Sequence, residues 1–487
     1  MFDHSLDDLD LYNAAFVGGQ WVGADFQPRQ IVSNPATGAR LGDVPLFGQD
    51  QANEAIESAQ RAFTEWRYSS ANTRYEALSN LARLVRENDT ALATIIVQEA
   101  GKPHSEALGE VTNAASHFEW FAGEALRIYG DTLPSSHFDR QVIITKEPVG
   151  VTAAITPWNF PLICVARKLG PALAAGCVQV LKPAPETPFC ALALAELSRR
   201  AGIPNGVFNV VTGDASEIGK AFTSHSAVRS ISFTGSTRVG EIIAADAGHH
   251  VKRISLELGG NAAFIVFDDA DLEDAIEDLI TNKFRNAGQA CVSANRVFVD
   301  ERVADLFSIG LAKAVSGLKV GHGTEPGVEI GPLISEAAIE KVERHVADAV
   351  SKGGTLIAGG GRAHSNGWFY TPTVLDHATD CMLVAKEETF GPVAALFRFS
   401  SVDEVIERAN ATPYGLSAYV YTQDLSKAVR VSNALDAGIV GVNCSSLSSP
   451  VTPFGGVKNS GFGREGSKYG MDPFLDIKTV QIKAREF

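Results

Sequence analysis

The sequence lacks an apolar run long enough to cross a bilayer, and it lacks an excess of basic residues. Its longest apolar stretches, such as residues 149–155, end well before the roughly 18 residues that a membrane helix needs. The 42 basic residues are outnumbered by 57 acidic ones, which gives a formal net charge of −15. Such a charge repels nucleic acid and anionic lipid unless basic residues are segregated, and no basic segment stands out. We therefore expect no membrane and no nucleic acid among its partners.

Paired cysteines and a recognisable targeting signal are also missing. The six cysteines are scattered and include no Cys-x-x-Cys pair, which is typical of reduced thiols rather than of a disulfide framework. The first 16 residues are acidic. A secretory signal begins with basic residues before an apolar core, and a transit peptide is rich in Arg and Ser. We expect a cytoplasmic protein.

The eleven histidines show no His-Glu-x-x-His motif or other tight ligand spacing, so no metal site is predicted. Internal repeats and low-complexity segments are absent as well. What is present is ordinary for a folded enzyme, with 45% hydrophobic and 20% charged residues. A chain of 487 residues is long enough for two or three domains.

From residue 149 onward, short apolar strands alternate with helical segments. The expected strands are GVTAAIT, VQVLK, GVFNVV, SISFTG and RISLEL. Thr187 is expected to cap one of the intervening helices, with Pro188 as its first residue. This alternation predicts an α/β fold with a parallel, doubly wound sheet. A second run of the same kind, over residues 262–441, predicts a second α/β domain.

Other segments fall outside this alternation. A helix is expected over residues 50–66, with Asp50 at its cap. Residues 130–145 are interpreted as a β-hairpin that interrupts the first domain, and the tail DPFLDIKTVQI as a further exposed strand. Unpaired strands usually find a partner, often in another subunit.

The sharpest chemical signal is FRNAGQACVSANR, in which Cys291 follows Gly-Gln-Ala. A single cysteine is most often a buried apolar residue, but here further motifs accompany it. They are TPWNFP with Asn159, LKPA with Lys182, FTGSTRVG with Gly235 and Ser236, LELGG with Glu257, and KEETFGP with Glu388 and Phe390. With these motifs in this order, the chain resembles the aldehyde dehydrogenase family over nearly its whole length.

The resemblance implies NAD(P)-dependent oxidation of an aldehyde to a carboxylic acid through a thioester on Cys291. An aldehyde has no leaving group other than hydride, so a nucleophile must first add to its carbon and form an oxyanion. A thiol is a strong nucleophile, and its thioester is readily hydrolysed. By the resemblance, the Asn159 amide and the Cys291 backbone N–H stabilise the oxyanion, and Glu257 activates the hydrolytic water.

The resemblance also implies a site for the cofactor, NADP or NAD. The predicted cofactor-binding residues are Trp158, Lys182, Pro185, Gly235, Ser236, Leu258, Glu388 and Phe390. Gly235 and Ser236 lie between a strand and a helix, where backbone N–H groups can bind a pyrophosphate. Lys182 is implied to contact the adenosine ribose, and Glu388 to hold the nicotinamide ribose. Pro185 stands where NAD-preferring members carry a glutamate on the 2′-hydroxyl, so the choice between the two cofactors stays open.

Within the family, the likeness is greatest to succinate-semialdehyde dehydrogenases, as in RKLGPALAAG and PFGGVKNSGFGREGSKYG. Those enzymes hold the substrate's distant carboxylate with two arginines and a serine, at positions that match Arg167, Arg285 and Ser448. This implies oxidation of succinate semialdehyde to succinate, with glutarate semialdehyde or a broad range of aldehydes as alternatives. Ser293 stands where some members carry a second cysteine, so their disulfide switch is not expected.

The residues disfavour two rival interpretations. An aldehyde dehydrogenase that passes its acyl group to coenzyme A is disfavoured by Glu257, a base for hydrolysis. A structural or interaction protein that has kept the fold is disfavoured by the complete set of chemical residues.

The implied organisation has a Rossmann-type NAD(P)-binding domain, an α/β catalytic domain and a small β element. The first comprises residues 1–127 and 149–258, and the second residues 259–458. Residues 128–148 and 459–487 form the β element, which is expected to join subunits into a homodimer or homotetramer.

Overall fold

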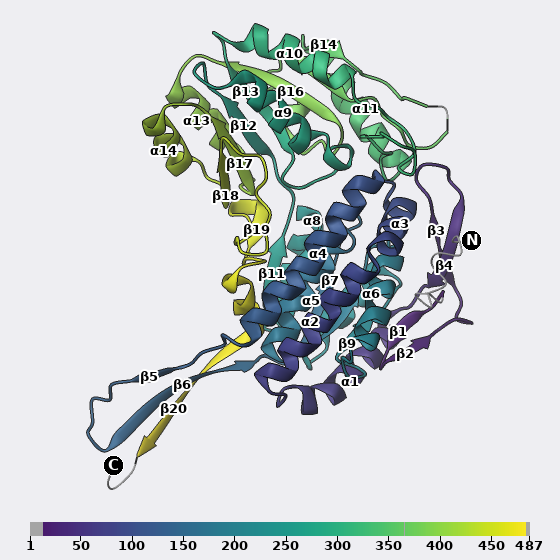
Figure 1. The fold of residues 1–487 in the computed structure, drawn as a ribbon, viewed down its shortest axis with the longest axis vertical. Helices are drawn as coiled ribbons and strands as arrows, with labels where there is room; N and C mark the ends of the chain where they lie inside the picture. The colour runs from purple at the N-terminus through teal and green to yellow at the C-terminus, as the bar shows by residue number, and fades with distance from the viewer. Residues whose placement is uncertain (1–12, 365, 484–487) are drawn as a thin grey trace.

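Two separate hydrophobic cores organise the molecule (Figure 1). The computed structural model describes residues 13–364 and 366–483, so the expectations for residues 1–12 and 484–487 lie outside the described residues. The first core runs from Phe16 to Leu258 and takes in three residues near the C-terminus, whereas the second begins at Ala262. None of the helices in the described ranges is long and apolar enough to cross a membrane.

The first lobe is built on a sheet whose central strands are parallel, which confirms the predicted doubly wound arrangement. Among the described residues, the strand order is β19-β11-β10-β7-β8-β9-β1-β2. The parallel strands are β7 (Val151–Ile155), β8 (Val178–Lys182), β9 (Phe208–Val210), β10 (Val228–Thr234) and β11 (Arg253–Glu257). The antiparallel edge strands are β1 (Ala15–Val17), β2 (Gln20–Val22) and β19 (Gly461–Phe462). The winding reverses between β7 and β10, and such a switch point opens a crevice at the carboxyl ends of the strands.

Helices cover both faces of this sheet. One face carries α5 (Ile163–Ala175) and α6 (Phe189–Arg200), over which α2 (Ala71–Glu87), α3 (Asp89–Ala100) and α4 (His104–Ala125) form a further layer. The other face carries α1 (Gln49–Trp66), α7 (Ala215–Ser224) and α8 (Thr237–His249). A ribbon of β3 (Arg29–Ser33) and β4 (Arg40–Pro45) lies beside α3 and α6 (Figure 1).

Two predicted helix starts are wrong in detail. The first helix is capped by Gly48, and Asp50 lies inside its first turn. Pro188 is the cap residue of α6 and not its first helical residue. The first N–H groups of α6 donate to the buried Glu99 carboxylate rather than to Thr187. The two carboxyl oxygens of Glu99 each accept one of these N–H groups, and the position of Glu99, 90 residues before Phe189, is invisible to local sequence patterns.

The second lobe confirms the second predicted α/β unit. Its described strands are ordered β14-β15-β16-β13-β12-β17-β18, and only β14 (Thr355–Ala358) runs antiparallel to its neighbour. The others are β12 (Ala262–Val266), β13 (Ala294–Asp300), β15 (Thr373–Asp376), β16 (Val393–Phe399), β17 (Ser417–Tyr421) and β18 (Ile439–Val442). The helices of this lobe are α9 (Leu272–Lys283), α10 (Ala304–Ser316), α11 (Glu336–Ser351), α12 (Leu383–Lys386), α13 (Val402–Asn410) and α14 (Leu425–Ala434).

A three-stranded arm projects away from both lobes (Figure 1). It consists of β5 (Asp131–Leu133), β6 (Arg140–Pro148) and β20 (Leu475–Lys483), so the tail strand pairs with the predicted hairpin of its own chain. Residues 459–474 differ from the expectation that they belong to this β element. In the structure, β19 pairs with β11, and the 3-10 helix η4 (Lys468–Phe474) packs against α5 of the first lobe.

Candidate active site

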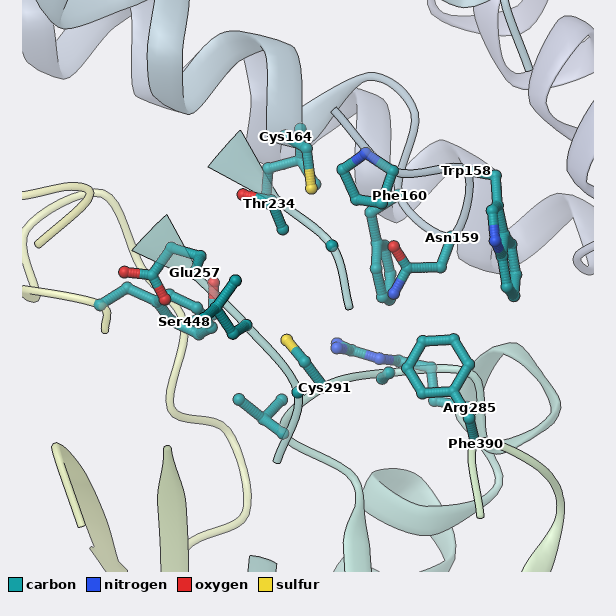
Figure 2. Close-up of a pocket in the computed structure, with 18 of the residues that line it drawn as sticks. Trp158, Asn159, Phe160, Cys164, Thr234, Glu257, Arg285, Cys291, Phe390 and Ser448 are labelled. Carbon is teal, nitrogen blue, oxygen red and sulfur yellow. The ribbon is translucent and has the colours of Figure 1, made fainter. Parts of the chain in front are cut away.

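A cavity of about 520 Å³ opens at the switch point of the first sheet and is lined by residues of both lobes (Figure 2). The segment after β7 and the segment after β10 form one wall. Of the sequence-predicted residues, the cavity lining contains Trp158, Asn159, Arg167, Gly235, Ser236, Glu257, Leu258, Arg285, Cys291, Glu388, Phe390 and Ser448. Lys182 and Pro185 lie outside this lining set, near the carboxyl end of the neighbouring strand β8.

Cys291 reaches the cavity from a tightly turned segment. The preceding 3-10 helix η2 (Arg285–Gly288) holds Asn286 and Ala287 at φ of 51° and 55°. Gly288 has φ of 74°, and a Cβ on it would lie 2.1 Å from the carbonyl oxygen of Gly391, so only glycine fits there. Burial raises the pKa of the Cys291 thiol, and the nearby Glu388 carboxylate adds to the effect. The thiol is therefore neutral until a bound group or a base favours its ionisation.

Asn159 is buried and fixed at both its side chain and its backbone. Its amide Nδ2 donates a 3.0 Å hydrogen bond to the carbonyl of Gln289. Its backbone carbonyl accepts hydrogen bonds from Lys102 Nζ at 2.8 Å and from Asn286 Nδ2 at 2.9 Å. An amide nitrogen carries two hydrogens, and the bond to Gln289 uses one, which leaves the other for a ligand in the cavity.

Glu257 ends strand β11 and is 3% exposed. Neither of its carboxyl oxygens has a hydrogen-bond partner among the residues that the structure describes. Burial, and next the charge of Glu465, hold the pKa of Glu257 well above its usual range. A buried carboxyl without partners is costly, which is typical of a functional group rather than of a structural one.

Glu465 and Lys168 were missed by the sequence analysis, although both lie in quoted segments. Lys168 donates hydrogen bonds to Glu465 and, at 2.7 Å, to the Thr234 hydroxyl. Lys168 is fully buried, and Glu465 and Thr234 line the cavity. The sequence feature that could have revealed them is the charge of Lys168 inside the apolar helix segment RKLGPALAA, because a lysine buried there needs a partner of opposite charge.

The three residues implied to bind a carboxylate all line the cavity. Arg167 donates a hydrogen bond to the Ser448 hydroxyl, and its guanidinium lies 4.3 Å from the ring centre of Phe454. The Arg285 guanidinium lies 5.1 Å from the ring centre of Phe160 and points into the cavity beside Cys291 (Figure 2). Aromatic faces attract guanidinium groups and leave their edges free to donate hydrogen bonds.

Most of the residues implied to bind the cofactor lie at the carboxyl edge of the first sheet, and Glu388 and Phe390 face that edge from the second lobe. Ser236 is the cap residue of α8. The N–H groups at the N-terminus of a helix favour binding of an anion. Lys182 is buried, and burial lowers its pKa to about 8. Burial raises the pKa of Glu388 to about 7, and its Oε1 accepts a 3.0 Å hydrogen bond from the N–H of Gly260. A helix N-terminus, a lysine and a carboxyl acceptor along one edge suit a dinucleotide.

Phe390 and Trp158 close this side of the cavity. Their rings meet edge to face, with centres 5.5 Å apart and planes at 88°. Phe390 has φ of 53°, which is unfavourable for a bulky residue and is held here by the surrounding packing. No group of three or more His, Cys, Asp or Glu side chains suited to a metal ion occurs among residues 13–364 and 366–483.

Comparison with known proteins agrees with this geometry. The chain matches the aldehyde dehydrogenase family over residues 21–480. It is 52% identical to an NADP(+) succinate-semialdehyde dehydrogenase of Escherichia coli, over 98% of this chain and 99% of that protein. It is 53% identical to 3-sulfolactaldehyde dehydrogenase of Pseudomonas putida, over 96% of this chain and 97% of that protein. The crystal structure of succinate-semialdehyde dehydrogenase from Burkholderia pseudomallei is similar with a TM-score of 0.97 and 52% identity, covering 99% of this chain and 100% of that one.

Proposed function

The chain belongs to the aldehyde dehydrogenase family of oxidoreductases, and we propose that it oxidises succinate semialdehyde to succinate with NADP or NAD as hydride acceptor. The observation that carries this proposal is the presence of Arg167, Ser448 and Arg285 in the same cavity as Cys291. A carboxylate that enters a closed site loses its hydration, and charged donors must replace the water. Two guanidinium groups and a hydroxyl supply those donors.

Cys291 forms the covalent bond to substrate. After the thiol has lost its proton, Sγ adds to the aldehyde carbon and the carbonyl oxygen becomes an oxyanion. The free N–H of the Asn159 amide and the Cys291 backbone N–H donate to that oxygen. A bound nicotinamide cofactor would supply the acceptor for the hydride of this carbon, and loss of the hydride would leave a thioester on Cys291.

Glu257 completes the reaction as a general base. As a carboxylate it takes a proton from a water molecule, whose oxygen adds to the thioester carbon. The C–S bond then breaks, the acid is released, and Cys291 returns as a thiolate. The high pKa that burial and Glu465 impose on Glu257 makes it a strong base once it is ionised.

The cofactor is held along the carboxyl edge of the first sheet in this proposal. Gly235 and Ser236 at the start of α8 bind the pyrophosphate, Lys182 the adenosine side and Glu388 the nicotinamide ribose. Support for NADP comes from the name of the Escherichia coli relative and from Pro185, which offers no carboxylate to repel a 2′-phosphate.

A second candidate substrate is a sulfonated aldehyde. The relative from Pseudomonas putida, at 53% identity, is named for 3-sulfolactaldehyde. A sulfonate is an anion with oxygen acceptors, so the same arginine and serine donors suit it.

A panel of aldehydes distinguishes these substrates. Succinate semialdehyde, glutarate semialdehyde, 3-sulfolactaldehyde and uncharged butanal are each assayed with NAD and with NADP by the absorbance of the reduced cofactor. We expect the highest kcat/KM for succinate semialdehyde. A higher value for the sulfonated aldehyde would favour the second candidate, and a preference for butanal would contradict both.

We also propose a role for each part of the fold. Residues 13–127, 149–258 and 459–474 form the cofactor-binding unit, and residues 259–458 the catalytic unit. The arm, with β20 at the edge of its sheet, joins subunits into a homodimer or homotetramer, because an edge strand presents unpaired N–H and carbonyl groups. Light scattering of the wild-type chain and of a variant that ends after residue 474 tests the assembly.

A further inference from the structure

A buried ion pair contacts the wall segment that carries Asn159, and its glutamate also belongs to the cavity lining. The Lys102 ammonium contacts the Glu110 carboxylate at 2.5 Å, and the two side chains are 0% and 1% exposed. Lys102 Nζ also donates a 2.8 Å hydrogen bond to the Asn159 carbonyl and lies 4.1 Å from the ring centre of Phe160. The lysine therefore contacts the residue proposed to stabilise the oxyanion and its immediate neighbour.

Glu110 fixes the other end of the same segment. Its Oε1 accepts backbone N–H bonds from Leu162 at 2.9 Å and from Ile163 at 3.2 Å, where α5 begins. A carboxylate is well placed at a helix N-terminus, because the first N–H groups have no partner within the helix. The turn from Asn159 to α5 is thus held by one ion pair at both of its ends.

Helix α4, which carries Glu110, also contacts the turn before Cys291. Glu106 lies one helical turn before Glu110 on α4, and its Oε2 accepts a 2.8 Å hydrogen bond from the backbone N–H of Asn286. Asn286 in turn donates from its side chain to the Asn159 carbonyl at 2.9 Å. Helix α4 therefore links the two segments that supply the proposed oxyanion donors, one from each lobe.

We propose that Lys102 and Glu110 are positioning residues that align the Asn159 amide with the Cys291 backbone N–H. The inference rests on the proposed function, since it presupposes that Asn159 stabilises the oxyanion. A buried ion pair is a poor way to gain stability, because well-packed apolar residues often do as well. Its value here lies in holding donors in place before reaction, since a displacement of about 1 Å can cost about 100-fold in rate.

The test is a double-mutant cycle on the acylation step. The rate of the first turnover of reduced cofactor is measured in the wild type, Lys102→Met, Asn159→Ala and the double variant. We expect Lys102→Met alone to slow acylation on the order of 10- to 100-fold. In the Asn159→Ala background the same change should cost about twofold at most, because its effect passes through Asn159.

A matched control separates positioning from stability. Glu99 is also fully buried and accepts N–H bonds from Phe189 and Cys190 at the start of α6, but it does not line the cavity. Glu99→Gln should therefore lower Tm without slowing acylation, whereas Glu110→Gln, which also leaves the Lys102 charge unpaired, should lower Tm further and slow acylation. Lys102→Met leaves the Glu110 charge unpaired, so the charge-free variant Lys102→Met/Glu110→Gln is measured beside it and carries the test if the single variant does not fold.

Two results would overturn the inference. The first is that Lys102→Met or the charge-free variant slows acylation in the Asn159→Ala background by the same factor as in the wild-type enzyme. The second is that Glu99→Gln slows acylation as much as Glu110→Gln does. If Asn159→Ala itself acylates at the wild-type rate, the proposed role of Asn159 fails and the inference with it. If Asn159→Ala is slow and the effects are additive, the inference alone fails.

Discussion

Lys168 donates a hydrogen bond to Glu465, 297 residues further along the chain, in the wall of the cavity that also contains Glu257. The pair places one negative and one positive charge near a buried carboxyl that has no hydrogen-bond partner of its own among the described residues. Of the two charges, Glu465 acts to raise the pKa of Glu257 and Lys168 acts to lower it. Substitution of Glu465 and substitution of Lys168 should therefore shift the pKa of Glu257 in opposite directions.

Replacing Glu465 by glutamine should shift the pH dependence of deacylation to lower pH. Glu257 acts as a base only when ionised, so the rate rises as pH passes through its raised pKa. Removal of the like charge at Glu465 lowers that pKa, and the rising limb of the profile moves in the acid direction. The measurement is the rate of thioester hydrolysis against pH after a single acylation.

Lys168→Met is the opposite control, because loss of the cation should move the same limb to higher pH. Shifts in the same direction for both variants, or no shift in either, would mean that another group controls the profile.

Most of the site residues that the sequence motifs predicted line the cavity, and the alternation of strands and helices predicted both sheets. The Lys168 to Glu465 pair and the contact of Lys102 with Asn159 were not predictable, because each joins residues that only the tertiary fold brings together. The same reason explains why the acceptor at the start of α6 is Glu99 and not the predicted Thr187. Local patterns predict which elements form, whereas buried polar contacts depend on the packing of distant elements.

Glu257→Gln should give one burst of reduced cofactor and then stall. Formation of the thioester needs the Cys291 thiolate and the oxyanion donors, but its hydrolysis needs a base. Glutamine keeps the shape of the side chain and cannot accept the proton from water. Rapid mixing should show a burst equal to the enzyme concentration, and mass spectrometry should show the acyl group on the protein.

Cys291→Ala provides the baseline for this experiment, because it cannot form the thioester and should give neither burst nor turnover. Loss of the burst in Glu257→Gln as well would mean that Glu257 also removes the proton from the Cys291 thiol.

Pro185→Glu should shift cofactor preference toward NAD. A glutamate at this position would accept hydrogen bonds from the 2′-hydroxyl of NAD and repel the 2′-phosphate of NADP, whereas the neighbouring Lys182 attracts the phosphate. The ratio of kcat/KM values for the two cofactors, measured with saturating aldehyde, reports the change. Glu186→Gln, at the adjacent exposed carboxylate, should shift the ratio the other way. An unchanged ratio in both variants would place discrimination elsewhere in the site.

Arg167 and Arg285 should be needed for aldehydes that carry a distant anion and not for uncharged ones. Truncating one partner of a desolvated charge pair costs about 2–5 kcal/mol. Arg167→Ala or Arg285→Ala should therefore lower kcat/KM for succinate semialdehyde roughly 30-fold or more. Ser448→Ala should cost less, because a neutral hydroxyl contributes about 0.5–1.5 kcal/mol per hydrogen bond.

Butanal is the internal control for these variants, since it has the same number of carbons and no carboxylate. It reacts at the same Cys291 and needs the same oxyanion donors, so its kcat/KM should change little when either arginine is removed. Arg167 also packs against Phe454, and its loss could disturb the cavity in general. In that case both substrates would lose activity equally, and the proposed contact of the arginines with the substrate's carboxylate would be contradicted even though the enzyme had become slower with succinate semialdehyde. Selective loss with the charged aldehyde in both arginine variants is the result that requires a direct contact with the substrate's carboxylate.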